Sequence, residues 1–305
     1  SPEPAGRCKI MTGTVSVRRQ KIPKNNIRRR LLFFLLLAGL LMLAVTFAEQ
    51  ICPYDPNAQI FSTLEPPSAA HPAGTDRFGR DMLSRILVGL QTSVLSTLTL
   101  VAIITVVGTI IGVLCGHLGG MVDAFMMRVC DVCLAFPGLV FAMAIAALLH
   151  GGLQNAVIAL AVISWPKYAR IARSQTLALE STDYVAAARL AGDTSAQIIF
   201  RHILPNSAGP ILVTAMLDIG TMMMELAGLS FLGLGAMPPT AELGNMMSGG
   251  RSMLQTYPWV IIGPGIAIFV AVVIFNLLGD TVRDYLDPRN SRRQSSANGK
   301  KEQEK

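Results

Sequence analysis

The sequence contains few charged residues for its length. Only 15% of its 305 residues are Asp, Glu, Lys or Arg, whereas 51% are apolar. Soluble domains carry roughly 25% charged residues. The composition therefore excludes an ordinary soluble enzyme and indicates a membrane protein that crosses the bilayer several times.

The sequence also lacks the motif with which many ATPases hold nucleotide. A phosphate-binding loop requires G-x-x-x-x-G-K-[ST], and Lys300, which follows a glycine, is succeeded by another lysine. The chain cannot bind ATP by that route, so a partner or an ion gradient must drive any pumping. No nucleophile, base and orienting group converge at one depth, so we do not expect an enzyme.

The cysteines show no pairing pattern that indicates disulfides. Cys130 and Cys133 form a CxxC pair, which could bind metal or carry redox chemistry. The pair lies inside a predicted membrane helix and has no second pair, so we interpret both residues as small packing residues.

The apolar residues gather into six predicted spans. A bilayer core about 30 Å thick requires roughly 20 apolar residues per helix. The first run could pass for a signal peptide, but its apolar core is too long and five spans follow, so we expect a retained anchor. The predicted spans are Leu31–Ala48, Thr92–Cys115, Ala124–Leu149, Val157–Ile171, Ile211–Leu232 and Trp259–Leu278.

The basic residues predict the orientation of these spans. With the N-terminus inside, 22 of the 26 Lys and Arg residues fall on the cytoplasmic side, and only Arg77, Arg80, Arg85 and Arg251 lie outside. Because basic flanks stay cytoplasmic, we expect both termini inside. We expect a cytoplasmic tail over 1–30, a membrane domain over 31–283 and a partly disordered cytoplasmic tail over 284–305.

Residues 183–206, "DYVAAARLAGDTSAQIIFRHILPN", read as helix, break, helix. Thr182 or Asp183 can cap the first helix, Gly192 can end it, and Asp193 or Thr194 can cap the second. We expect Pro205 to stop the second helix. Helices this short are unstable alone, so they must dock on something or lie on the lipid surface. Their apolar stripes are Tyr184, Ala187, Ala188, Ala191 and Ala196, Ile199, Phe200, Ile203.

"AAARLAG" and the later "ILP" resemble the EAA loop of ABC import permeases, here within 173–206. The resemblance implies that this loop carries a coupling helix that docks into an ATPase subunit, with Gly192 as pivot. The chain departs from the pattern at Ala186, where the family has glutamate, and at His202, where isoleucine is common. The implied ATPase-coupling residues are Tyr184, Ala187, Ala188, Arg189, Gly192, Ile199, Arg201, Leu204 and Pro205.

Further motifs resemble the C-type permease of the dipeptide, oligopeptide and nickel importers. They are "GTDRFGRDMLSR", "LSFLGLGAMPPTAELG" and "FNLLGDTVRDYLDPR", and the resemblance covers about Gly74 to Arg289. It implies an all-α type I importer permease in a bacterial inner membrane, paired with a B-type permease. It also implies two ATPase subunits and an extracytoplasmic binding protein as further partners. ATP would be used by the partners, and no cofactor is implied for this chain.

The sequence of the fifth predicted span indicates which substrate the transporter carries. Its "LDIG-x-MM" and "AGLSFLGLG" look most like the corresponding segments of nickel permeases, and short peptides are the alternative substrate.

Three residues of the fifth span are candidates for a role in transport. Asp218, Met222 and Glu225 are spaced i, i+4, i+7 and so share one helix face. Buried acids in a span face a partner or a water-filled path, so these three are candidates for the translocation pathway. The acids could equally bond to the other permease. A secondary transporter would also explain intramembrane acids, but not a docking helix pair.

Overall fold

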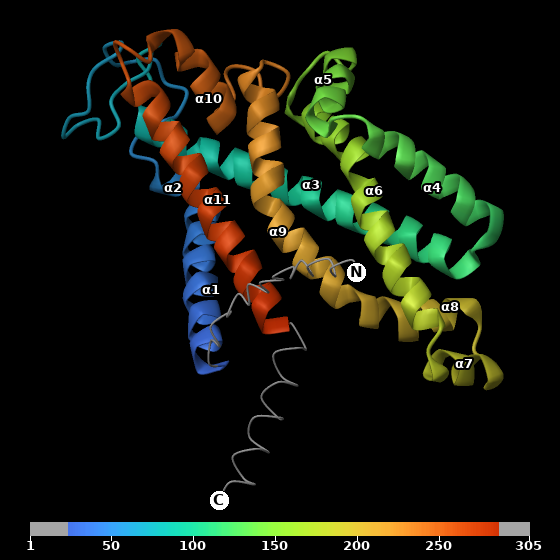
Figure 1. The fold of residues 1–305 in the computed structure, drawn as a ribbon. Helices are drawn as coiled ribbons and strands as arrows, with labels where there is room; N and C mark the ends of the chain where they lie inside the picture. Colours follow the sequence, from blue (N-terminus) through green and yellow to red (C-terminus); the bar gives the residue numbers. More distant parts are fainter. Residues whose placement is uncertain (1–23, 287–305) are drawn as a thin grey trace, which may run out of the picture.

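The structure is a computed structural model that describes residues 24–286 and, over that range, consists of helices and loops. The two predicted tails fall largely outside the described residues. In Figure 1, α10 and the long loop that precedes α3 lie at one end of the molecule. The start of α1, the end of α11 and the α7–α8 pair lie at the other end. The helices are α1 Lys24–Thr46, α2 Ala48–Ile51, α3 Met82–Leu118, α4 Gly120–Ala135, α5 Gly138–Leu148, α6 Leu153–Glu180, α7 Asp183–Leu190, α8 Ser195–Ile198, α9 Leu204–Phe231, α10 Leu243–Gly250 and α11 Trp259–Leu286.

Four of the predicted spans appear as long apolar helices. Sufficiently long and apolar stretches cover Arg28–Thr46, Met82–Leu118, Ser195–Phe231 and Trp259–Leu286. They correspond to the first, second, fifth and sixth predicted spans, each longer than or close to the predicted length. The fourth predicted span is α6, which has 28 residues but contains Lys167, Arg170 and Arg173. Because of these three cations, the mean hydropathy of α6 is too low for it to be recognised as a membrane span.

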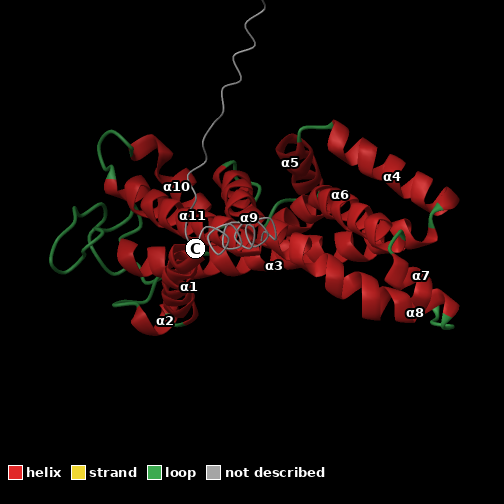
Figure 2. Ribbon diagram, turned by 60° about the horizontal axis from the view of Figure 1, so that its bottom comes forward, coloured by secondary structure: helices red, strands yellow, loops and turns green. Residues whose placement is uncertain are grey.

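The third predicted span is broken, contrary to the continuous Ala124–Leu149 helix expected from hydropathy. Helices α4 and α5 meet at a bend of 93°, and Figure 2 shows them as two separate rods beside α6. Pro137 lies at the break and Phe136 before it is extended. The break follows because proline lacks an N–H donor and disfavours helical geometry in the residue that precedes it.

Glycines let α3 and α6 approach closely. Gly108, Gly112 and Gly116 lie one turn apart on α3 and face α6. A Cβ at position 112 would lie 2.2 Å from the Ala169 carbonyl oxygen, and one at position 108 would lie 2.5 Å from Tyr168 Cβ. Small residues are favoured at such contacts because association of helices in lipid depends on tight packing.

The loop before α3 contains tight turns at two glycines. Gly74 and Gly79 adopt φ of +74° and +69°, which side chains other than glycine rarely adopt. Asp81 then caps α3 by accepting a hydrogen bond from the Ser84 N–H at 2.8 Å. The same carboxylate lies 2.9 Å from His71 Nδ1, so the loop is fixed to the start of α3.

The cysteines in the described range are free. Cys130 is buried and Cys133 is partly buried, in agreement with a packing role. Burial, reinforced by the nearby Asp81 and Glu49 carboxylates, raises the pKa of the Cys52 thiol. Cys52 therefore stays a neutral thiol at neutral pH and is a poor nucleophile.

We expect Gly112→Ala to destabilise the protein by about 1–3 kcal/mol, because the added methyl group would force α3 away from α6. Gly39→Ala in α1 is the control, since nothing lies within 4 Å of a Cβ there. Thermal unfolding of the purified protein in detergent measures both. Equal stability of the two variants would contradict the close α3–α6 contact.

Candidate functional site

The α7–α8 end of the molecule carries exposed apolar side chains. Helix α7 is followed by Gly192, with φ of +93°, as predicted. Tyr184, Leu190 and Phe200 are 43%, 91% and 70% exposed. Exposed apolar side chains of this kind are typical of surfaces that bind a partner or lie against lipid. We call Tyr184, Leu190 and Phe200 the apolar patch.

The residues that hold this segment onto the rest of the chain match the predicted stripes only in part. Val185, Ile198 and Ile203 are buried and join the main core cluster, and of these three only Ile203 belonged to a predicted stripe. The predicted stripe residues Ala187 and Ala191 are exposed. The apolar stripe of α7 thus faces outward, and the neighbouring face of α7 packs inward.

We expected the second helix of the segment to end at Pro205, but it does not. Thr194 caps α8 through a capping box with Gln197. The chain then passes through a π-helical turn, Ile199–Ile203, directly into α9. Pro205 lies in the first turn of α9, directly after the π-helical turn, so it removes one backbone N–H donor there without ending the helix. Helix α9 therefore connects the segment directly to the membrane domain.

The predicted coupling residues remain accessible to different degrees. Tyr184, Ala187, Arg189, Gly192, Arg201 and Pro205 are exposed, whereas Ala188, Ile199 and Leu204 are partly buried. Arg189 already forms an ion pair within the chain, with Glu180 Oε2 at the end of α6. Arg201 forms no ion pair with any residue in the described range. Sequence reasoning missed Glu180 because it lies outside both predicted stripes.

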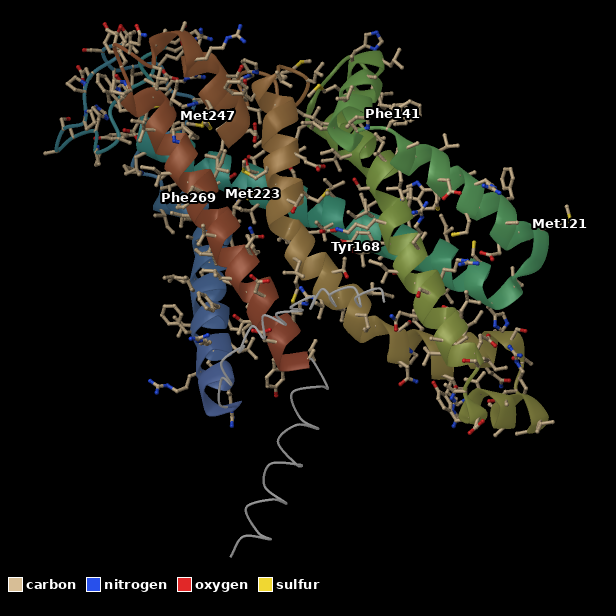
Figure 3. The ribbon with its side chains drawn as sticks, in the orientation of Figure 1. Met121, Phe141, Tyr168, Met223, Met247 and Phe269 are labelled. Carbon is tan, nitrogen blue, oxygen red and sulfur yellow. The ribbon has the colours of Figure 1, made fainter. Side chains whose placement is uncertain are left out.

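Inside the membrane domain, Asp218 of α9 is only 5% exposed and is fully paired. Lys167 Nζ of α6 donates to its two carboxylate oxygens at 2.6 and 2.8 Å. Tyr168 Oη donates to Oδ2 at 3.0 Å. Figure 3 shows Tyr168 between α6 and α9. The Asp218 carboxylate therefore joins two helices of the same chain, whereas the alternative in the sequence analysis placed its partner on the other permease.

The other two candidates on this face behave differently from Asp218. Met222 is 6% exposed and packs in the main core cluster, so its sulfur is not available to a passing ion. Glu225 is partly buried and makes no hydrogen bond or ion pair with another described residue. No group of three metal-ligating side chains exists between residues 24 and 286.

Two further ion pairs fix α4 against α6. Arg173 donates to both carboxylate oxygens of Asp123, from Nε at 2.5 Å and from Nη2 at 2.6 Å. Arg170 pairs with Asp131, about two turns further along α4. Planar two-point contacts of this kind restrict orientation as well as distance. All three cations of α6 are thus neutralised by acids from α4 and α9.

Comparison with known families identifies the family of this chain. Residues 108–292 match the family of binding-protein-dependent transport system inner membrane components. The chain belongs to this family.

Curated relatives of this permease are similar over most of its length. The probable D,D-dipeptide transport system permease of Escherichia coli K12 is 45% identical over 84% of this chain and 86% of its own. The glutathione permease of Pectobacterium atrosepticum is 44% identical over 82% and 84%. The dipeptide permease of Alkalihalophilus pseudofirmus is 42% identical over 74% of each chain.

The fold is also shared with a solved transporter. A chain of the inward-facing MetNI methionine ABC transporter superposes with a TM-score of 0.54 and 21% identity, covering 67% of this permease and 97% of that chain. The permease therefore has the type I ABC importer fold. It is a membrane subunit and not an enzyme. Importers of this family combine permease, ATPase and substrate-binding subunits.

We expect Lys167→Met to destabilise the permease by about 1–3 kcal/mol, and more than Asp218→Asn. Removing Lys167 leaves a buried carboxylate without its cation, whereas Lys167 itself is half-exposed and can reach water. The double variant Lys167→Met/Asp218→Leu should lose less than the sum of the two single variants. Thermal unfolding in detergent tests this, with Glu225→Gln as the control that should change little. Additive losses would show that the pair is not coupled.

Proposed function

We propose that the chain is the permease subunit of an ATP-driven importer of short peptides. The observation that carries this proposal is the set of relatives at 42–45% identity, which are named for D,D-dipeptide, glutathione and dipeptide transport. Peptides were the alternative in our sequence reading, and nickel was the first choice. The comparisons do not show a nickel-specific resemblance, and Asp218 and Met222 are engaged within the fold. Peptide transport is therefore the better-supported reading.

The test is uptake by cells that express the complete transporter, compared with the same cells lacking this chain. We expect uptake of a radiolabelled dipeptide to require the chain and to be inhibited by excess unlabelled dipeptide. Nickel should neither be taken up through this chain nor compete. Chain-dependent nickel uptake that dipeptide does not inhibit would instead establish the nickel reading.

We further propose that the apolar patch of residues 184, 190 and 200 docks an ATPase subunit on the cytoplasmic side. The patch lies at the same end of the molecule as the start of α1 and the end of α11 (Figure 1). An N-in, C-in orientation puts 22 of 26 basic residues in cytoplasmic segments or in the spans next to them, which supports a cytoplasmic location. A partner B-type permease and an extracytoplasmic binding protein would complete the transporter.

We expect Leu190→Asp to prevent the ATPase subunits from purifying with the permease, because it introduces a charge at the most exposed apolar residue of the patch. The matched control is Leu254→Asp, an exposed leucine near α10 at the opposite end. Affinity purification from membranes followed by quantification of each subunit measures the effect. ATPase subunits that remain bound to the Leu190→Asp variant would refute this docking surface.

A further inference from the structure

The carboxylate of Glu180 links three helices at the α7 end. One oxygen, Oε1, lies 2.5 Å from His117 Nδ1 in the last turn of α3. The other oxygen, Oε2, accepts a hydrogen bond from Arg189 Nη2 on α7. Glu180 is itself the last residue of α6. Each oxygen of one side chain is therefore bound to a different helix.

Helix α7 has few other attachments to the chain. It is eight residues long, and Val185 is its one buried side chain. Two residues, Ser181 and Thr182, connect it to α6. A helix of this length has no stability of its own, so its position depends on its contacts. Val185 anchors α7 at one point, the Tyr184 ring lies 6.1 Å from the His202 ring, and the Glu180–Arg189 pair binds α7 to the end of α6.

On the other side of Glu180, α3 and α6 form one rigid unit. The glycine contacts at 108, 112 and 116 leave no space for one helix to slide over the other. Thr176, one turn before Glu180, lies against Gly116, directly beside His117. A displacement of α7 that acts through Arg189 is therefore delivered to both long helices together. The Lys167–Asp218 pair then extends this connection from α6 to α9.

We infer that Glu180 is a positioning residue that transmits movement of α7 to the α3–α6 unit, acting through Arg189 and His117. This inference rests on the proposed docking of α7 to an ATPase subunit. Binding of the ATPase uses the exposed patch, whereas Glu180 is mostly buried behind it. Docking and transmission are thus carried by different residues and can be separated by experiment.

The experiment uses the complete transporter in proteoliposomes, with its ATPase subunits, partner permease and binding protein. Glu180→Gln removes the charge and keeps the shape. We expect the ATPase subunits to remain bound and to hydrolyse ATP, while dipeptide transported per ATP hydrolysed falls roughly fivefold or more, a typical size for coupling between sites. An unchanged ratio would overturn the inference, and so would loss of the ATPase subunits.

Asp123→Asn is the matched control. Asp123 is 15% exposed against 13% for Glu180, and it also binds an arginine, but it joins α4 to α6 and has no contact with α7. We expect this variant to lose stability while keeping transport per ATP near that of the unmodified transporter. An equal fall in both variants would show that Glu180 acts only through general stability.

Arg189 provides a second series if Glu180→Gln cannot be purified. Its side chain is half-exposed, so substitutions there should fold. We expect Arg189→Ala to lower the ratio and Arg189→Lys to restore most of it, because lysine keeps the charge. Equal ratios for alanine and lysine would overturn the inference. Failure of the docking proposal has a different signature, because Leu190→Asp would then retain its ATPase subunits.

Discussion

The close contact between α3 and α6 determines how the other helices can be placed. In lipid, two apolar helices gain little free energy by burying apolar surface, because the lipid is itself apolar. They therefore associate through tight packing and hydrogen bonds. The glycines at 108, 112 and 116 provide that packing against Tyr168, Ala169 and Thr176. This contact fixes the rotation of α6 about its axis. It thereby determines the directions in which the cations of α6 point.

The pairing of those cations with acids explains why α6 can belong to a membrane domain. Lys167 meets Asp218, Arg170 meets Asp131 and Arg173 meets Asp123. Isolated charges are expensive within a bilayer, whereas paired charges are tolerated. Helix α6 is thus the centre of the domain, since α3 packs on it through glycines while α4 and α9 are bound to it by ion pairs.

Local features of the sequence predicted much of this fold. Hydropathy located the long apolar helices, and glycine identified the end of α7 at Gly192 because positive φ is a local requirement. The break at Pro137 was missed because apolar residues on both sides concealed it. Periodicity predicted two amphipathic helices in the 183–206 segment, but could not tell which face packs inside the chain and which faces outward.

The candidate site was less predictable, because its contacts join distant parts of the sequence. Asp218 was identified as an intramembrane acid, yet its partner Lys167 lies 51 positions away on another helix. Glu180 and His117 are 63 positions apart, and neither stands out in its local pattern. Such pairs depend on the register between packed helices, which composition and spacing do not contain.

The order of these charges along the chain bears on how the protein is made. The acids of α4 are synthesised before the arginines of α6, so Asp123 and Asp131 are available when α6 leaves the ribosome. Asp218 is synthesised only later, with α9. Until then Lys167 has no acid to neutralise it, and its half-exposed ammonium group must be hydrated by water instead. The link between α6 and α9 is therefore the last to form, after the two links between α4 and α6.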